Sequence, residues 1–180
     1  MLFKNRQIFI VFIFLGMFFS CKKNEKTINQ MKPYTGPVAQ VTNVEMLFSD
    51  SGQIKVKMKA PKQDEYLNGD RIFPSGILLI FNDKQGNENA NLVANYGKYD
   101  KTNNVYTAKG NVIITDLKEG KKMKSEEMNW NPTTKKVYTT KFVRIETKEE
   151  ILTGNGLDAD QDFKHYKIVN PAGVFSVNQE

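Results

Sequence analysis

The sequence predicts an all-β protein, a rolled β-sheet that follows an N-terminal signal or anchor segment. Beyond residue 40, apolar and polar residues alternate with a period of two in one segment after another. Groups rich in Gly, Asn and Asp separate these segments, as expected for turns. No window combines a sustained apolar period of 3.6 with helix-capping residues. The 180 residues suffice for one domain with a sizeable core.

Residues 1–20 have the pattern of a secretory signal peptide. Lys4 and Arg6 make the start positive, and an apolar run follows from Ile8 to Phe19. This run is shorter than the roughly 20 apolar residues that a helix needs to cross a bilayer. We therefore expect a leader, with a retained anchor as the alternative.

The only cysteine, Cys21, stands at the expected cleavage point. A lone cysteine there is typical of bacterial lipoprotein signals, in which this residue carries the lipids and becomes the mature N-terminus. Phe18, three positions earlier, departs from the leucine that is commoner at that place. The alternative is a leader that merely contains a cysteine. Lipidation of Cys21 is the prediction, and a single cysteine excludes an internal disulfide.

Residues 21–40 are polar, contain Pro33 and Pro37, and are expected to form a flexible tether. The net charge of the whole chain is +6. Lysines alternate with apolar residues instead of forming a dense basic block, so a nucleic-acid partner is not expected. The charge indicates at most an anionic partner.

The clearest prediction is a hairpin, in which residues 44–48 and 54–58 alternate in polarity around a turn at residues 49–52. Further strands are predicted at residues 77–81, 92–96, 105–107, 112–114, 123–130, 137–139, 142–145, 150–153, 156–160, 166–169 and 173–177. Residues 104–114 echo residues 136–145. Repeated strand pairs of this kind favour a regular rolled sheet over an irregular sandwich.

The residues needed for catalysis are nearly missing. His165 is the only histidine, and the run at Gly120 lacks the first glycine and the hydroxyl of a phosphate-binding loop. Asp158, Asp160 and Asp162 are spaced like the start of a calcium loop. That loop requires a glycine and a glutamate where this chain has Phe163 and Val169, so a solvated sheet face is favoured. No enzyme activity, cofactor or metal site is expected.

An exported rolled sheet without catalytic groups suits the carriage of lipid. An interior lined by aliphatic and aromatic side chains gains roughly 0.8 kcal/mol for each methylene of an acyl chain that it buries. The polar head of the lipid stays outside, near lysines at the rim. Exposed terminal strands can also pair with the edge strands of neighbouring proteins and extend the sheet.

Four segments carry a resemblance to a known family, namely residues 108–114, 125–132, 143–145 and, most distinctively, 152–163. They resemble the LptC family of periplasmic lipopolysaccharide-export proteins over about residues 40–177. The resemblance implies one open OstA-like β-jelly roll at residues 41–177. It also implies that lipopolysaccharide arrives from an inner-membrane ABC transporter (LptB, LptF and LptG) and leaves to the bridge protein LptA.

In that family the first strands join the transporter and the last strands meet the bridge. Carried onto this chain, the resemblance implies partner-binding edges at Val41 and Val44 on one side and at Ile168, Val174 and Val177 on the other. Well-known members keep a transmembrane helix, whereas a lipid on Cys21 is expected to hold this chain facing the periplasm. The inner membrane is the favoured place.

The lipid-binding groove is predicted to be lined by the inward residues of the strands. These are Phe48, Ile54, Val56, Met58, Leu79, Phe81, Tyr96, Val112, Ile114, Trp130 and Ile145. A one-residue error in register would exchange the two faces of a strand, and plain core packing is the alternative role for each residue. The rival function is a surface or periplasmic β-rich lipoprotein that serves as a structural or adhesion module.

Overall fold

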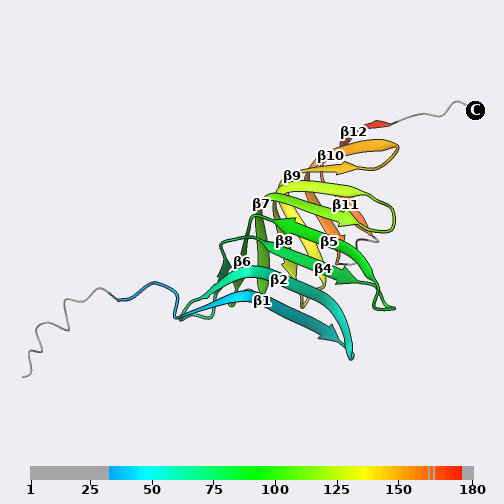
Figure 1. The fold of residues 1–180 in the computed structure, drawn as a ribbon. Helices are drawn as coiled ribbons and strands as arrows, with labels where there is room; N and C mark the ends of the chain where they lie inside the picture. The colour runs from blue at the N-terminus through cyan, green and yellow to red at the C-terminus, as the bar shows by residue number, and fades with distance from the viewer. Residues whose placement is uncertain (1–32, 162, 164, 176–180) are drawn as a thin grey trace, which may run out of the picture. The chain divides into compact units, whose positions relative to one another are not determined.

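The computed structural model describes residues 33–161, 163 and 165–175, and side chains as far as Gly173. The described chain folds into one antiparallel sheet of twelve strands (Figure 1). The strands are β1 (Ala39–Asp50), β2 (Gln53–Glu65), β3 (Arg71–Phe73), β4 (Ile77–Asn82), β5 (Glu88–Ala94), β6 (Tyr96–Asp100), β7 (Val105–Asp116), β8 (Lys122–Asn131), β9 (Lys136–Glu146), β10 (Glu150–Asp160), β11 (Tyr166–Ile168) and β12 (Ala172–Phe175). The prediction of an all-β rolled sheet is confirmed.

The hairpin of β1 and β2 forms as its alternating sequence predicts. Ser51 and Gly52 both have positive φ at the turn, and Met46 lies directly opposite Met58. On β2, buried Val56 and Met58 alternate with half-buried residues. The alternation therefore sets which face of the hairpin joins the core.

The sheet divides between β2 and β7 and closes again. The first half of β2 continues through β4 and β5 to the second half of β7, whereas the end of β2 continues through β3 and β6 to the first half of β7. These pairings form a closed ring. The strands β4 and β5 on one side of the ring and β3 and β6 on the other belong to two layers that face each other.

The longer strands bend, and each supplies one half to each layer. Register shifts interrupt the pairing of β7 with β8 beyond Lys109, of β8 with β9 beyond Ser125, and of β9 with β10 beyond Asn155. Gly110 and Asn111 have positive φ at the bend of β7. The bulges let one strand turn from one layer into the other, so segments that the sequence separates into two strands are continuous here.

The core lies between the layers. A Cβ added at Gly97 of β6 would lie 2.7 Å from Cγ2 of Ile77 on β4, so the layers approach closely at this point. Buried side chains from β2, β4, β5, β7, β8, β9 and β10 extend this contact into one apolar cluster. The buried side chains of both layers therefore form one common core.

The N-terminal predictions fall mostly outside the described residues. Cys21, residues 1–20 and the tether as far as residue 32 lie there, and so do Asp162 and Val177. β1 begins at Ala39. Among the described residues, none forms a helix of the length and apolar character that a membrane span requires.

Candidate functional site

Most of the predicted groove residues lie between the two layers and are fully buried there. They are Val56, Met58, Leu79, Phe81, Val112, Ile114, Trp130 and Ile145. Phe48 is half-buried on β1 and packs against this core, and Ile54 is 39% exposed at the start of β2. The interior is therefore filled by its own side chains, and its role as a lipid groove stays a prediction.

The prediction that Tyr96 lines the groove is wrong, because its side chain lies on the outward face of the sheet. The sequence predicts one strand through residues 92–96, but the chain breaks at Asn95, whose N–H donates to the carbonyl of Gly110. β6 starts afresh at Tyr96, and its buried residues are Gly97 and Tyr99. The inward aromatic residue of this strand is thus Tyr99.

A row of paired residues crosses the inward face of four neighbouring strands. Arg71 lies opposite Tyr99, Tyr99 opposite Tyr106, and Tyr106 opposite Trp130. The two tyrosine rings stack with centroids 4.5 Å apart, and the rings of Tyr106 and Trp130 follow at 5.2 Å. We call these four side chains the aromatic row. The sequence prediction found only its last member.

Arg71 ends the aromatic row with a positive charge. Its guanidinium carbon lies 5.3 Å from the centroid of the Tyr99 ring, and its Nη1 lies 3.8 Å from the sulfur of Met46. Its Nε is buried and has no hydrogen-bond partner among the described atoms. Burial raises the pKa of Tyr106 to about 12, while the charge of Arg71 acts in the opposite direction.

β1 covers the aromatic row from the opposite layer. Phe48 meets the rings of Trp130 and Tyr106 edge-on, with centroid separations of 5.0 and 5.5 Å. At the tip of the hairpin, Asp50 pairs with Lys135, which lies in the turn between β8 and β9. This hydrogen-bonded pair lowers the pKa of the Asp50 carboxyl. The hairpin is thus held over the interior at two points.

Two edges of the sheet end in strands with a single neighbour. β1 pairs with β2 alone, and at the other end β11 and β12 each pair with β10 alone among the described strands. Val41 is exposed on β1, whereas Val44 and Ile168 are half-buried and pack against the core. Val174 lies opposite Ile151 in β12. The predicted partner residues on described strands therefore do lie at the edges.

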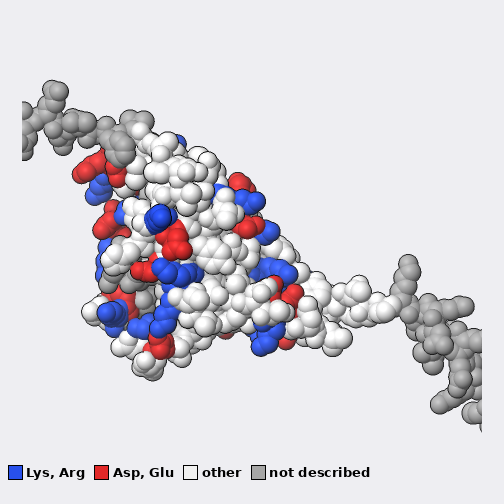
Figure 2. All heavy atoms as spheres, turned by 180° about the vertical axis from the view of Figure 1, so that it is seen from behind, with Lys and Arg blue, Asp and Glu red and all other residues white. Residues whose placement is uncertain are grey.

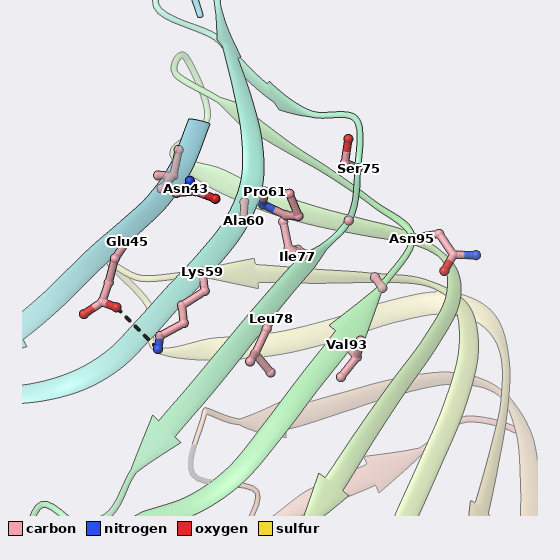
Figure 3. A pocket seen from close by; sticks show the side chains of 13 residues that line it. Asn43, Glu45, Lys59, Ala60, Pro61, Ser75, Ile77, Leu78, Val93 and Asn95 are labelled. Carbon is pink, nitrogen blue, oxygen red and sulfur yellow. Dashed lines mark ion pairs between the residues drawn. The ribbon is translucent and has the colours of Figure 1, made fainter. Parts of the chain in front are cut away.

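A hollow of about 770 Å³ opens on the outer side of β1, β2, β4 and β5 (Figure 3). Leu78 and Val93 lie side by side at its floor, and the ion pair of Glu45 with Lys59, at 3.4 Å, flanks it. A second, polar hollow of about 670 Å³ lies at the hairpin tip and includes Asp50 and Lys135. Neither hollow is lined by the aromatic row.

The outer surface carries charges of both signs. On the face seen in Figure 2, basic and acidic side chains lie intermixed. Asp158 and Asp160 both pair with Lys136, at 3.3 and 2.8 Å, and this pairing lowers the pKa of Asp160. His165 is exposed and lies 3.4 Å from Asp160. Within the described residues, no group of three acidic, histidine or cysteine side chains has a metal-binding arrangement.

Comparisons with known proteins agree with this architecture. Among solved structures, the fold is similar to LptH of Pseudomonas aeruginosa, described as the LptA-homologous periplasmic component of the conserved lipopolysaccharide transport device. The TM-score is 0.53 at 14% identity, over 72% of this chain and 100% of LptH. No curated protein sequence matches the chain significantly. The family described as "LptC: Lipopolysaccharide-assembly, LptC-related" matches residues 8–171, and the chain therefore belongs to the LptC-related family.

Proposed function

We propose that this protein is a membrane-tethered, periplasm-facing component of lipopolysaccharide export that binds the lipid between the layers of its sheet. It receives lipopolysaccharide from the inner-membrane transporter formed by LptB, LptF and LptG and passes it to the bridge protein LptA. The observation that carries the proposal is the continuous apolar interior between β2 and β10. Membership of a lipopolysaccharide-assembly family supports the choice of lipid.

The filled interior sets a requirement on how lipid is loaded. Met58, Val143 and Ile145 are completely buried, so acyl chains can enter only if the layers separate. β1 is the strand best suited to move, because it has only β2 as a strand neighbour, whereas β2 also pairs with β3 and β4. Each acyl methylene that moves from water into the interior contributes roughly 0.8 kcal/mol, which favours loading once the layers have separated.

Partner binding is proposed to use the two sheet edges. Val41 and Val44 mark the β1 edge, which would extend the sheet toward the transporter. Ile168 and Val174 mark the edge toward LptA, and Val177, outside the described residues, is proposed to belong to the same partner-binding segment. An unpaired strand edge offers a row of backbone donors and acceptors, and a second strand satisfies them at little cost in side-chain fit. Cys21 would carry the lipid that holds the chain at the inner membrane.

Photo-crosslinking in cells tests the interior directly. A photoreactive residue at Ile114, which is buried between the layers, should capture lipopolysaccharide, whereas the same residue at the neighbouring Ile113 on the outer face should not. Equal capture at both positions would rule out the interior as the lipid site. Depletion should also trap lipopolysaccharide at the inner membrane, and normal delivery would favour a structural or adhesion lipoprotein.

The tether is tested separately. Cys21→Ala should prevent lipidation and the cleavage that accompanies it, so the protein should keep its leader and gain apparent mass. A variant that remains membrane-bound at unchanged size would show that residue 21 carries no lipid, and it would leave the interior site untouched.

A further inference from the structure

We propose that Arg71 forms an anion-binding site at the end of the interior, which takes a phosphate group on the sugar head of the bound lipid. The inference rests on the proposed function and deepens it by naming how the head is recognised. It starts from one unusual observation. A cationic side chain faces the interior of the roll, and its buried Nε has no partner among the described atoms.

The strand register places Arg71 on the inward face. It lies two residues before fully buried Phe73 on β3 and directly opposite buried Tyr99 on β6. Lysines of the neighbouring strands behave differently. Lys57, Lys98 and Lys124 alternate with buried residues and therefore occupy the outward face. Arg71 is thus a positive charge on the same side as the apolar core.

No carboxylate neutralises Arg71 in the described structure. Asp70, its neighbour in sequence, pairs with Lys98 at 3.4 Å, and Asp64 pairs with Lys62 at 3.2 Å. Glu65 lies opposite Arg71 on β2, but the two side chains form no ion pair within 4 Å among the described contacts. A half-buried guanidinium without a counter-ion is suited to an anion that arrives from outside.

The contacts that Arg71 does make orient it without neutralising it. The Tyr99 ring holds the guanidinium by a cation–π contact, and the thioether of Met46 is only a weak acceptor. The phenol of Tyr106 also interacts with Arg71, but it is a neutral group and not a counter-ion. An oxyanion can accept two parallel N–H bonds from a guanidinium. It is therefore a far stronger partner for Arg71 than the Tyr99 ring or the Met46 sulfur. Met46 is flexible and lies on β1, so it can yield its place when β1 moves.

The chemistry of the aromatic row suggests where the lipid head begins. Trp130 and Tyr106 continue from Arg71 toward the apolar core, and tyrosine and tryptophan suit a boundary between apolar and polar groups. Acyl chains would lie along the core side of the row. A phosphate on the adjoining sugar would then reach Arg71 at the end of the row.

The test compares three probes on the full chain, with the emission of Trp130, the only tryptophan, as the signal. The probes are lipopolysaccharide, the same material after enzymatic dephosphorylation, and inorganic phosphate. Wild type should bind the phosphorylated lipid about tenfold more tightly than the dephosphorylated one, which corresponds to the loss of one charge-assisted contact. Inorganic phosphate alone should give no Arg71-dependent signal.

Arg71→Gln should abolish this preference while it keeps the affinity for dephosphorylated lipid, and Arg71→Lys should restore part of it. Arg144→Gln is the matched control, since Arg144 lies on the outer face and pairs with Glu146 at 2.7 Å. Glu65→Gln should preserve or strengthen the preference. A parallel loss in Glu65→Gln would assign Arg71 a structural role instead.

The outcomes separate the inference from the function. An unchanged preference in Arg71→Gln, with intact binding and a native circular-dichroism spectrum, would overturn the anion site alone. An Arg71-dependent response to inorganic phosphate equal to that of the lipid would make free phosphate the ligand and also overturn it. If neither lipid binds to wild type, the proposed function fails and the anion site fails with it.

Discussion

The ring of Phe48 meets the indole of Trp130 edge-on, 5.0 Å from centroid to centroid, although one residue lies on the first strand and the other on the eighth. The contact joins the two layers of the sheet across the interior. It is reinforced at the hairpin tip, where Asp50 pairs with Lys135. A side chain of β1 thus covers the place where acyl chains are proposed to lie.

Phe48→Ala should open this cover. We expect a loss of about 1–3 kcal/mol in unfolding free energy, less than the roughly 3–5 for a fully buried phenylalanine, because Phe48 is half-buried. Trp130 should become more accessible to acrylamide, which fluorescence quenching measures. Leu47→Ala is the control, since Leu47 is the adjacent outward residue and is 53% exposed. Equal quenching in the two variants would contradict the role of Phe48 as a cover.

The ion pair of Asp50 with Lys135 should hold the hairpin tip through charge. Both Asp50→Lys and Lys135→Asp should speed amide exchange in the hairpin, and the double variant should restore the wild-type rate. High salt should weaken the wild-type contact, because both side chains are well exposed. Deuterium exchange followed by mass spectrometry measures each case. Failure of the double variant to recover would mean that the pair does not hold the tip.

The same pair has a defined pH dependence. Lys135 lowers the pKa of Asp50 below its ordinary value of 3.8. The folded state therefore favours the ionised carboxylate, and its contribution is complete above the ordinary value. It is lost as the pH falls through the lowered pKa. We expect the protection of hairpin amides, relative to their intrinsic exchange rate at each pH, to fall in that acidic range for wild type but not for Asp50→Asn, and identical profiles would contradict the assignment.

The alternating segments could be predicted well, because one face of each is buried. The hairpin of β1 and β2 and the inward residues Val56 and Met58 follow from period two alone. Bends could not be predicted in this way. Gly110 and Asn111 have the composition of a turn between strands, yet bulged pairing carries β7 straight through them into the second layer.

The aromatic row shows the limit more sharply. Arg71 belongs to a three-residue strand between polar and proline-containing segments, which is too short to show a period. Tyr99 was hidden because the break at Asn95 reverses the faces of the residues that follow. Tyr106 and Ala108 alternate as buried residues on β7, but the predicted groove set did not include Tyr106. Non-local pairing decides such positions, and no local pattern reports it.

Tyr106 should cause a loss of stability in alkali. Burial raises its pKa to about 12 in the folded protein, against an ordinary value of 10.0. The folded state therefore favours the neutral phenol, and this contribution is complete below pH 10 and declines as the pH rises toward 12. Tyr106→Phe should flatten the decline of the unfolding free energy over that range. Denaturant unfolding at several pH values measures it, and parallel curves would contradict the prediction.

Gly154 should be intolerant of any side chain, because the chain beyond β11 crosses directly over it. A Cβ at this position would lie 2.7 Å from the carbonyl oxygen of Val169 and would also collide with Cγ2 of Ile168. Gly154→Ala should therefore displace β11 from β10 and cost about 1–3 kcal/mol, as overpacking does. The edge proposed to meet the bridge protein would be disturbed with it, so crosslinking from Ile168 to LptA should fall.

Gly86→Ala is the control, since Gly86 has a positive φ but open space around its Cβ position. It should lose some stability through backbone strain and keep the crosslink. Equal loss of the crosslink in both variants would show that general destabilisation, and not the displaced edge strand, governs contact with the bridge.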